Sequence, residues 1–170
     1  MSNRQITIAI DAMGGENNPL KNLKGAEIFS RNKTNVLLKI FGDERLIAKE
    51  IKDHKIELNN YELIDCIENV KDEDNANIIL RSRKKSSIFK GLSYVKENKD
   101  CGFVSAGNTA ALMILSRLIL GMINGIDRPA ICSKIPNKNS YSLMMDLGAN
   151  VHVNAQNLMQ FALMGCAYFS

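Results

Sequence analysis

Two patterns of hydrophobic and polar positions alternate along the chain. Short runs of β-branched and apolar residues predict buried strands, and longer segments with apolar residues every three or four positions predict amphipathic helices. The predicted strands cover residues 5–11, 35–41, 61–67, 101–104 and 141–146, with a loop at 126–132 leading into another strand. The predicted helices run from about 19 to 31, 44 to 53, 78 to 99, 109 to 122 and 156 to 170.

This alternation predicts the fold class. Strands and helices follow one another every ~30 residues, and parallel strands need such crossovers. We therefore expect an α/β, Rossmann-like, mostly parallel sheet with helices on both faces, forming one domain over residues 1–170. The apolar face of the last helix has no later element to cover it. We expect that the chain is the N-terminal portion of a longer protein, so that the fold is truncated, or that dimerisation covers this face.

Capping residues predict where several helices begin. Asn18 is a candidate N-cap with Pro19 at the first helical position, and Asp43 is a candidate cap for the next helix. Ser86 or Ser87 is expected to start a new helix inside the segment 78–99, so we expect a break there.

Composition limits the function classes. Hydrophobic residues are 45% of the chain, charged residues 24%, and the net charge is +4. Such a mild positive excess fits an acidic partner or a phosphorylated ligand, and we expect no nucleic acid partner. Residues 101–170 carry only six charged side chains. We expect that segment to form core, ligand cleft or subunit interface.

The four cysteines lack metal-ligand or redox spacing, and most lie beside apolar residues. They are expected to be buried free thiols of a cytoplasmic protein that holds no metal. The longest apolar run, residues 110–123, is too short to cross a bilayer, while peripheral membrane contact stays open.

Three loops share one arrangement, in which small residues and a polar side chain follow a predicted strand. Ligands of open parallel sheets gather at the carboxyl ends of the strands, and a helix N-terminus attracts anions. The three loops are therefore expected to converge on one cleft for phosphate or a thioester oxygen. The alternatives are tight turns and an ordinary capped helix. The candidate binding residues are Asp11, Gly14, Gly15, Ser105, Gly107, Asn108, Thr109, Asp146 and Asn150.

A basic run supplies the candidate docking residues Arg81, Arg83, Lys84 and Lys85. It is either a solvated helix face or a patch for an acidic carrier or a phosphate. Arg128 lies in a nearly charge-free region and is expected to have a ligand or a carboxylate partner, with an ion pair to Asp127 or Asp146 as the plain alternative. The sequence contains no Walker loop, dinucleotide fingerprint, zinc spacing or nucleophile elbow, and the catalytic residues stay unassigned.

Five segments, IAIDAMGGENNP, RSRKKSS, VSAGNTAALM, GIDRPA and MMDLGAN, occur in an order and spacing that resemble the bacterial PlsX family of phosphate acyltransferases. The resemblance runs from about Ile6 to Ser170. The family usually has glycine at Ala110, aspartate at Glu16 and proline at Ala76. Its members are roughly twice as long, and its catalytic residues from the second half have no counterpart here.

The resemblance implies a phosphotransacetylase-like fold and a reaction in which inorganic phosphate attacks a long-chain acyl-ACP. The products are acyl phosphate for phospholipid synthesis and free acyl carrier protein, and no cofactor is implied. The family is homodimeric and in some bacteria membrane-associated. Two alternatives remain. One is an inactive truncated fragment that acts at most as a carrier-binding or dimerising module, and the other is an unrelated phosphate-ligand enzyme.

Overall fold

The structure is a computed structural model that describes residues 6–33, 35–68, 70, 74, 78 and 84–169. The chain divides into two compact units, Met1–Leu120 and Gly121–Ser170. We describe each unit by itself. The prediction of one domain over residues 1–170 stays a prediction.

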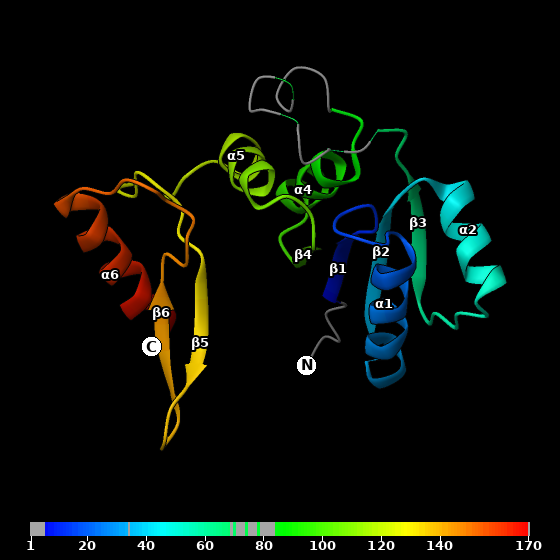
Figure 1. Cartoon of the computed structure of the whole chain (residues 1–170), viewed down its shortest axis with the longest axis horizontal. Helices are drawn as coiled ribbons and strands as arrows, with labels where there is room; N and C mark the ends of the chain where they lie inside the picture. The colour runs from blue at the N-terminus through cyan, green and yellow to red at the C-terminus, as the bar shows by residue number, and fades with distance from the viewer. Residues whose placement is uncertain are drawn as a thin grey trace. The chain divides into compact units, whose positions relative to one another are not determined.

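The first unit contains a four-stranded parallel sheet (Figure 1). Its strands are β1 (Ile6–Asp11), β2 (Val36–Gly42), β3 (Tyr61–Asp65) and β4 (Cys101–Ser105), in the spatial order β3-β2-β1-β4. β1 lies at the centre and pairs in parallel with both β2 and β4. In this register Asp11 lies beside Phe41 on one side and Ser105 on the other, so the carboxyl ends of three strands are level.

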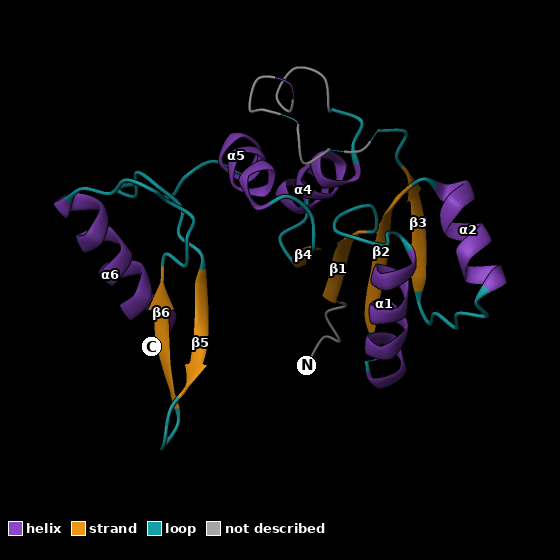
Figure 2. Cartoon of the chain, viewed as in Figure 1, coloured by secondary structure: helices purple, strands orange, loops and turns teal. Residues whose placement is uncertain are grey.

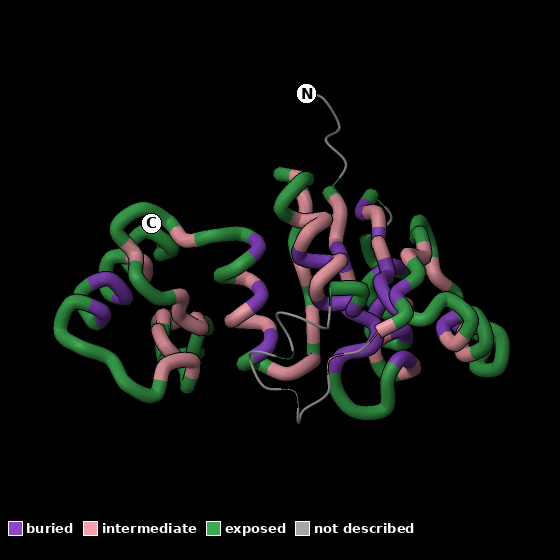
Figure 3. Tube along the Cα trace, turned by 90° about the horizontal axis from the view of Figure 1, so that it is seen from above, coloured by how far each residue is buried: buried purple, intermediate pink, exposed green. Residues whose placement is uncertain are grey.

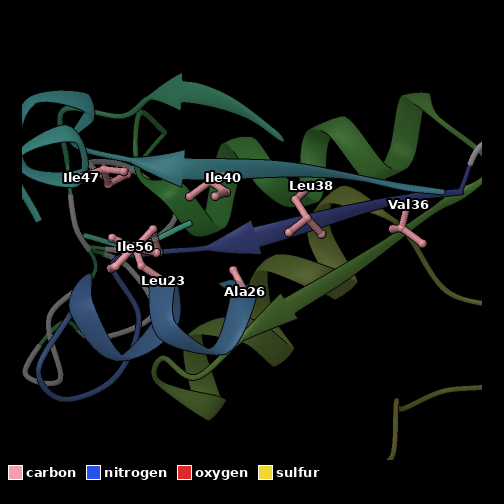
Figure 4. Packing of buried hydrophobic residues seen from close by; sticks show 8 residues of the cluster. Leu23, Ala26, Val36, Leu38, Ile40, Ile47 and Ile56 are labelled. Carbon is pink, nitrogen blue, oxygen red and sulfur yellow. The ribbon is translucent and has the colours of Figure 1, made fainter. Parts of the chain in front are cut away.

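Helices cover both faces of this sheet, as the sequence predicts (Figure 2). Successive strand residues point to opposite faces. On one face, β1 and β2 pack against α1 (Leu20–Asn32) and α2 (Glu44–Asp53). Figure 4 shows side chains of this core: Leu23, Ala26, Val36, Leu38, Ile40, Ile47 and Ile56.

On the other face, Ala9 and Phe41 pack against α4 (Ser87–Glu97). The helix α5 (Thr109–Ile119) then packs on α4 through Ala111 and Leu115. Figure 3 shows this burial as purple stretches of the chain.

Most of the predicted helix starts are confirmed. The Asp43 carboxylate accepts from the N–H of Leu46 at 3.0 Å, and the Ser86 side chain caps α4, which begins at Ser87. The prediction for α1 is wrong, because Pro19 is the N-cap residue and the helix begins at Leu20. The Asn18 amide is used instead to close the preceding loop, where it donates to two carbonyl groups.

The second unit contains a hairpin of β5 (Cys132–Pro136) and β6 (Tyr141–Met145), followed by α6 (Ala155–Phe169). The two strands pair antiparallel in a sheet of their own. The expectation that Asp146–Asn150 lies at the edge of the parallel sheet is therefore wrong. The connection at 137–140 has room for a hairpin turn, whereas a parallel pair needs a crossover of a dozen or more residues.

The second unit exposes large apolar side chains on α6. They are Leu158, Met159, Leu163, Tyr168 and Phe169. Across the residues that the structure describes, no helix combines the length and the apolar character needed to span a membrane.

Candidate anion-binding site

The candidate site is built around the carboxylate of Asp11, which is 3% exposed at the end of β1. Its Oδ1 accepts the Met13 N–H at 3.1 Å and the Ser87 hydroxyl at 2.6 Å. Its Oδ2 accepts the Ser105 hydroxyl at 2.7 Å. One buried carboxylate therefore joins β1 to the first residue of α4 and to the last residue of β4.

The loop after β4 is held through Ser105. The Ser105 Oγ accepts the N–H of Gly107 at 3.1 Å while its own proton is donated to Asp11. The next residue, Asn108, caps α5, because its Oδ1 accepts the N–H of Ala111 at 2.9 Å. A line of hydrogen bonds and neighbouring residues thus runs from the Asp11 carboxylate to the start of α5.

The glycines let the two loops touch each other. A Cβ atom on Gly14 would lie 2.6 Å from the Asp11 Oδ2 and 2.7 Å from the Gly107 nitrogen. Gly15 has a φ of +83°, and a Cβ there would lie 2.8 Å from the Ala106 carbonyl oxygen. Gly14 and Gly15 are therefore needed for the contact between the two loops.

Two asparagines fix the first loop from inside. The Asn18 side-chain nitrogen donates to the carbonyls of Met13 at 2.8 Å and Gly15 at 2.7 Å. The Asn22 side-chain nitrogen, from the first turn of α1, donates to the carbonyls of Ala12 and Gly14, both at 2.8 Å. Sequence reasoning missed the role of Asn22, and it placed Ser87 only as a helix start.

A cavity of about 460 Å³ opens beside these loops. It is lined by the loop after β1, the loop after β4 and the beginnings of two helices, α4 and α5. The first N–H groups of a helix lack partners within the helix, and the macrodipole adds positive potential there. Two helix N-termini at one cavity form a site suited to an anion. The lining residues are Asp11, Met13, Gly14, Gly15, Glu16, Asn18, Val70, Ser87, Ile88, Ala106, Gly107, Asn108 and Thr109.

Seven of the nine candidate binding residues thus lie in the first unit, and six of these, all but Ser105, line this cavity. The other two, Asp146 and Asn150, lie in the second unit and contact each other. The Asn150 side-chain nitrogen donates to the Asp146 Oδ1 at 2.8 Å and to the Pro129 carbonyl at 2.9 Å. Their contribution to the anion site stays a prediction.

The expected partner of Arg128 is different in the structure. Its guanidinium donates to the main-chain carbonyl of His152 at 3.2 Å rather than to Asp127 or Asp146. Asp127 is bound by Gln160, whose side-chain nitrogen donates to the Asp127 Oδ2 at 3.0 Å. Arg128 therefore stabilises a loop of the second unit.

Of the basic docking residues, Arg81 and Arg83 lie outside the described residues. Lys84 and Lys85 are exposed, and the Lys85 N–H donates to the Glu68 carboxylate at 3.1 Å. Their exposure leaves both ammonium groups accessible to an acidic partner, and docking stays a prediction.

The cysteines do not all match the expectation of buried thiols. Cys66 is buried, but Cys101 and Cys132 are only partly buried, and Cys166 on α6 is exposed. Burial raises the pKa of the Cys66 thiol to about 11, which makes it a poor nucleophile. Among the described residues, no three His, Cys, Asp or Glu side chains gather in a way that could hold a metal ion.

The fold is that of the phosphotransacetylase-like α/β proteins. The solved phosphotransacetylase of Streptococcus pyogenes superposes with a TM-score of 0.67 over 94% of this chain and 52% of that one, at 16% identity. That likeness concerns the fold alone.

Family membership follows from sequence. Residues 6–170 match the model of the family described as "Fatty acid synthesis protein". The phosphate acyltransferase of Wolbachia pipientis wMel is 44% identical over 98% of this chain and 49% of its own length. That of Caldicellulosiruptor bescii is 41% identical over 96% and 49%. The chain belongs to this family, which is the PlsX family. It spans about half the length of the curated relatives it matches.

Proposed function

We propose that this chain takes part in the transfer of a long-chain acyl group from acyl-ACP to inorganic phosphate, and that the cavity beside Asp11 binds the phosphate. The observation that carries the proposal is the presence of two helix N-termini at one cavity in a member of a phosphate acyltransferase family. Backbone N–H groups and the Thr109 hydroxyl can donate to phosphate oxygens, as they do at other helix N-termini.

The proposed reaction needs little from the protein beyond positioning and electrostatic stabilisation. A phosphate oxygen attacks the thioester carbonyl carbon, the C–O bond forms, and the C–S bond breaks. The thiolate leaves on the carrier and takes up a proton; a thiol with a pKa of ~8.5 is a good leaving group. One donor placed at the tetrahedral oxyanion is typically worth about 3 kcal/mol. The start of α5 is suited to hold either the phosphate or this oxyanion.

The partners follow from the same proposal. The acyl carrier is acidic, and the basic run with Arg81, Arg83, Lys84 and Lys85 is its proposed docking site. A homodimer is proposed as the assembly, with Asp146 and Asn150 as further contributors to the cleft. The proposed location is the cytoplasm, where the protein is free or peripherally associated with the membrane.

A second candidate function is an inactive module that binds the carrier or dimerises. It is favoured by the exposed side chains of Lys84 and Lys85, whose positive charge complements an acidic carrier. A carrier-binding surface can act without a complete catalytic cleft, since docking requires only the complementary charge.

One experiment separates the two functions. The purified chain is mixed with palmitoyl-ACP, with and without inorganic phosphate. Because hydroxylamine also cleaves the thioester, acyl phosphate is measured as the phosphate-dependent part of the acyl hydroxamate formed. In parallel, phosphate binding is followed by ³¹P NMR and carrier binding by calorimetry. Acyl phosphate formation supports the transferase. Carrier binding without phosphate binding or turnover supports the module, and the absence of both kinds of binding would overturn both proposals.

A further inference from the structure

We propose that Asp11 is a positioning residue that fixes two helix N-termini around the anion without contacting the anion itself. This inference rests on the proposed function, because the anion is the phosphate of that reaction. Asp11 lines the cavity, so its assignment as a phosphate ligand was the natural expectation. The surroundings of its carboxylate favour a different role.

The electrostatics oppose a direct contact. A carboxylate and a phosphate repel each other, and the repulsion grows where water is excluded. The Asp11 side chain is almost completely buried, and its two oxygens already accept from three donors. The space next to Oδ2 is also filled by Gly14, where even a Cβ atom would lie 2.6 Å away. Both carboxylate oxygens are therefore already hydrogen-bonded to donors of the protein.

The first set of contacts that begins at Asp11 leads to the start of α5. Because the Ser105 hydroxyl donates to Asp11, its lone pairs are available to the N–H of Gly107. The position of Gly107 then fixes Asn108, the cap of α5. The directions of the first N–H groups of α5 thus depend on where the Asp11 carboxylate holds Ser105.

A second contact of Asp11 leads to the start of α4. The hydroxyl of Ser87, the first residue of that helix, donates to Asp11 Oδ1 at 2.6 Å. Hydrogen bonds to a charged acceptor are stronger than neutral ones. The same carboxylate therefore holds the beginnings of α4 and α5 at one cavity, although Ser87 and Ser105 lie 76 and 94 residues from Asp11 along the chain.

The test measures the dissociation constant of inorganic phosphate for the 170-residue chain by ³¹P NMR. Asp11→Asn keeps the shape of the side chain, removes its charge and replaces one acceptor by a donor. We expect phosphate to bind at least about fivefold more weakly, even though a negative charge has been removed. If Asp11 only bordered the anion, its replacement would have the opposite effect on the dissociation constant, because removing its negative charge would tighten phosphate binding. Equal or tighter binding by Asp11→Asn overturns the proposal.

Two variants at Ser105 test whether Asp11 acts through the Ser105 hydroxyl, and both keep the Asp11 carboxylate. Ser105→Ala is expected to weaken phosphate binding as Asp11→Asn does, and Ser105→Thr, which keeps the hydroxyl, is expected to restore it. The double variant Asp11→Asn/Ser105→Ala should bind no more weakly than the weaker single variant, because both remove one shared interaction. Additive losses would show that Asp11 does not act through Ser105.

A matched control separates positioning from general stability. Ser30 is 1% exposed, and its hydroxyl donates to the Glu27 carbonyl and accepts the N–H of Asn59. Ser30→Ala therefore removes a buried hydroxyl away from the cavity and should leave phosphate affinity unchanged.

If the unaltered chain binds no phosphate, the proposed function fails at this site, and the positioning role is then judged by hydrogen exchange. Faster exchange of the amides of 107–111 in Asp11→Asn supports the role, and unchanged exchange overturns it.

Discussion

The Oδ2 of Asp11 and the Oγ of Ser105 lie 2.7 Å apart, although 94 residues separate them along the chain. The two residues are paired in the parallel register of β1 and β4, each at the carboxyl end of its strand. Sheet order, rather than nearness in sequence, therefore brings the two glycine-containing loops to one point. The starts of α4 and α5 line the cavity beside that point, at the carboxyl ends of the strands where an α/β protein binds its ligand.

Gly14→Ala is expected to separate the two loops. The added methyl group would lie within 3 Å of the Asp11 carboxylate and of Gly107, where backbone has to move. Overpacking of this kind costs about 1–3 kcal/mol, and phosphate affinity should fall with it. Urea unfolding and ³¹P NMR measure the two effects.

Gly25→Ala is the matched control for this change. Gly25 lies inside α1, and a Cβ atom there meets nothing within 4 Å. Alanine should raise stability by up to about 1 kcal/mol, because it is the better helix former, and should leave phosphate affinity unchanged. If Gly14→Ala behaves as Gly25→Ala does, the two loops do not depend on their contact.

Two substitutions of Asn108 separate capping from anion binding. Asn108→Ala removes the acceptor for the Ala111 N–H and should cost about 1 kcal/mol of stability. Asn108→Asp keeps the cap, and its charge is favourable at a helix N-terminus, so stability should be kept. The aspartate charge should nevertheless weaken phosphate binding by repulsion. Thermal melts and ³¹P NMR test both changes, and unaltered phosphate affinity in Asn108→Asp would limit this loop to a capping role.

Much of this site could be predicted from single positions. Asp11 ends one apolar run and Ser105 follows another, and a polar residue at a strand end indicates a functional edge in this fold class. Asn108 directly precedes the apolar run of the next helix, as a cap does. The contribution of Ser87 could not be predicted, because the contact of its hydroxyl with Asp11 depends on how α4 packs on the sheet. Asn22 lies on a helix with no pattern that marks it as a donor to the preceding loop.

The third loop shows where reasoning from strand ends fails. Asp146 also follows an apolar run, so it resembled the other two loops. The strand before it pairs with its immediate neighbour in a hairpin. The four residues between the two strands decide this pairing, because so short a connection can join antiparallel strands but not a parallel pair.

Alkaline pH is expected to destabilise the first unit through Cys66. Burial is the main reason that the pKa of this thiol rises from 9.0 to about 11. The positive charge of Lys90 opposes the rise, whereas the negative charges of Asp65 and Asp11 add to it. The folded protein holds this proton more tightly than the unfolded chain. The contribution to stability is therefore complete below pH 9 and is lost as the pH rises through 11.

The measurement compares the free energy of unfolding of the native sequence and of Cys66→Ala between pH 8 and pH 11. The native sequence should lose more stability across this range, because the two proteins differ only at this thiol. Parallel curves would show that the thiol ionises as easily in the folded state as in the unfolded chain. The exposed Cys166 should be alkylated first at pH 8.

The second unit is expected to depend on Gln160, which is 2% exposed on α6. Its Oε1 accepts the Asp127 N–H and its nitrogen donates to the Asp127 carboxylate, both at 3.0 Å. Gln160→Leu leaves both Asp127 groups without this partner, which should cost about 1–3 kcal/mol. Faster hydrogen exchange along α6 is the expected result, whereas Gln156→Ala at an exposed position of the same helix should leave it unchanged. Equal exchange in the two variants would mean that apolar packing, rather than this polar pair, holds α6 to the segment before β5.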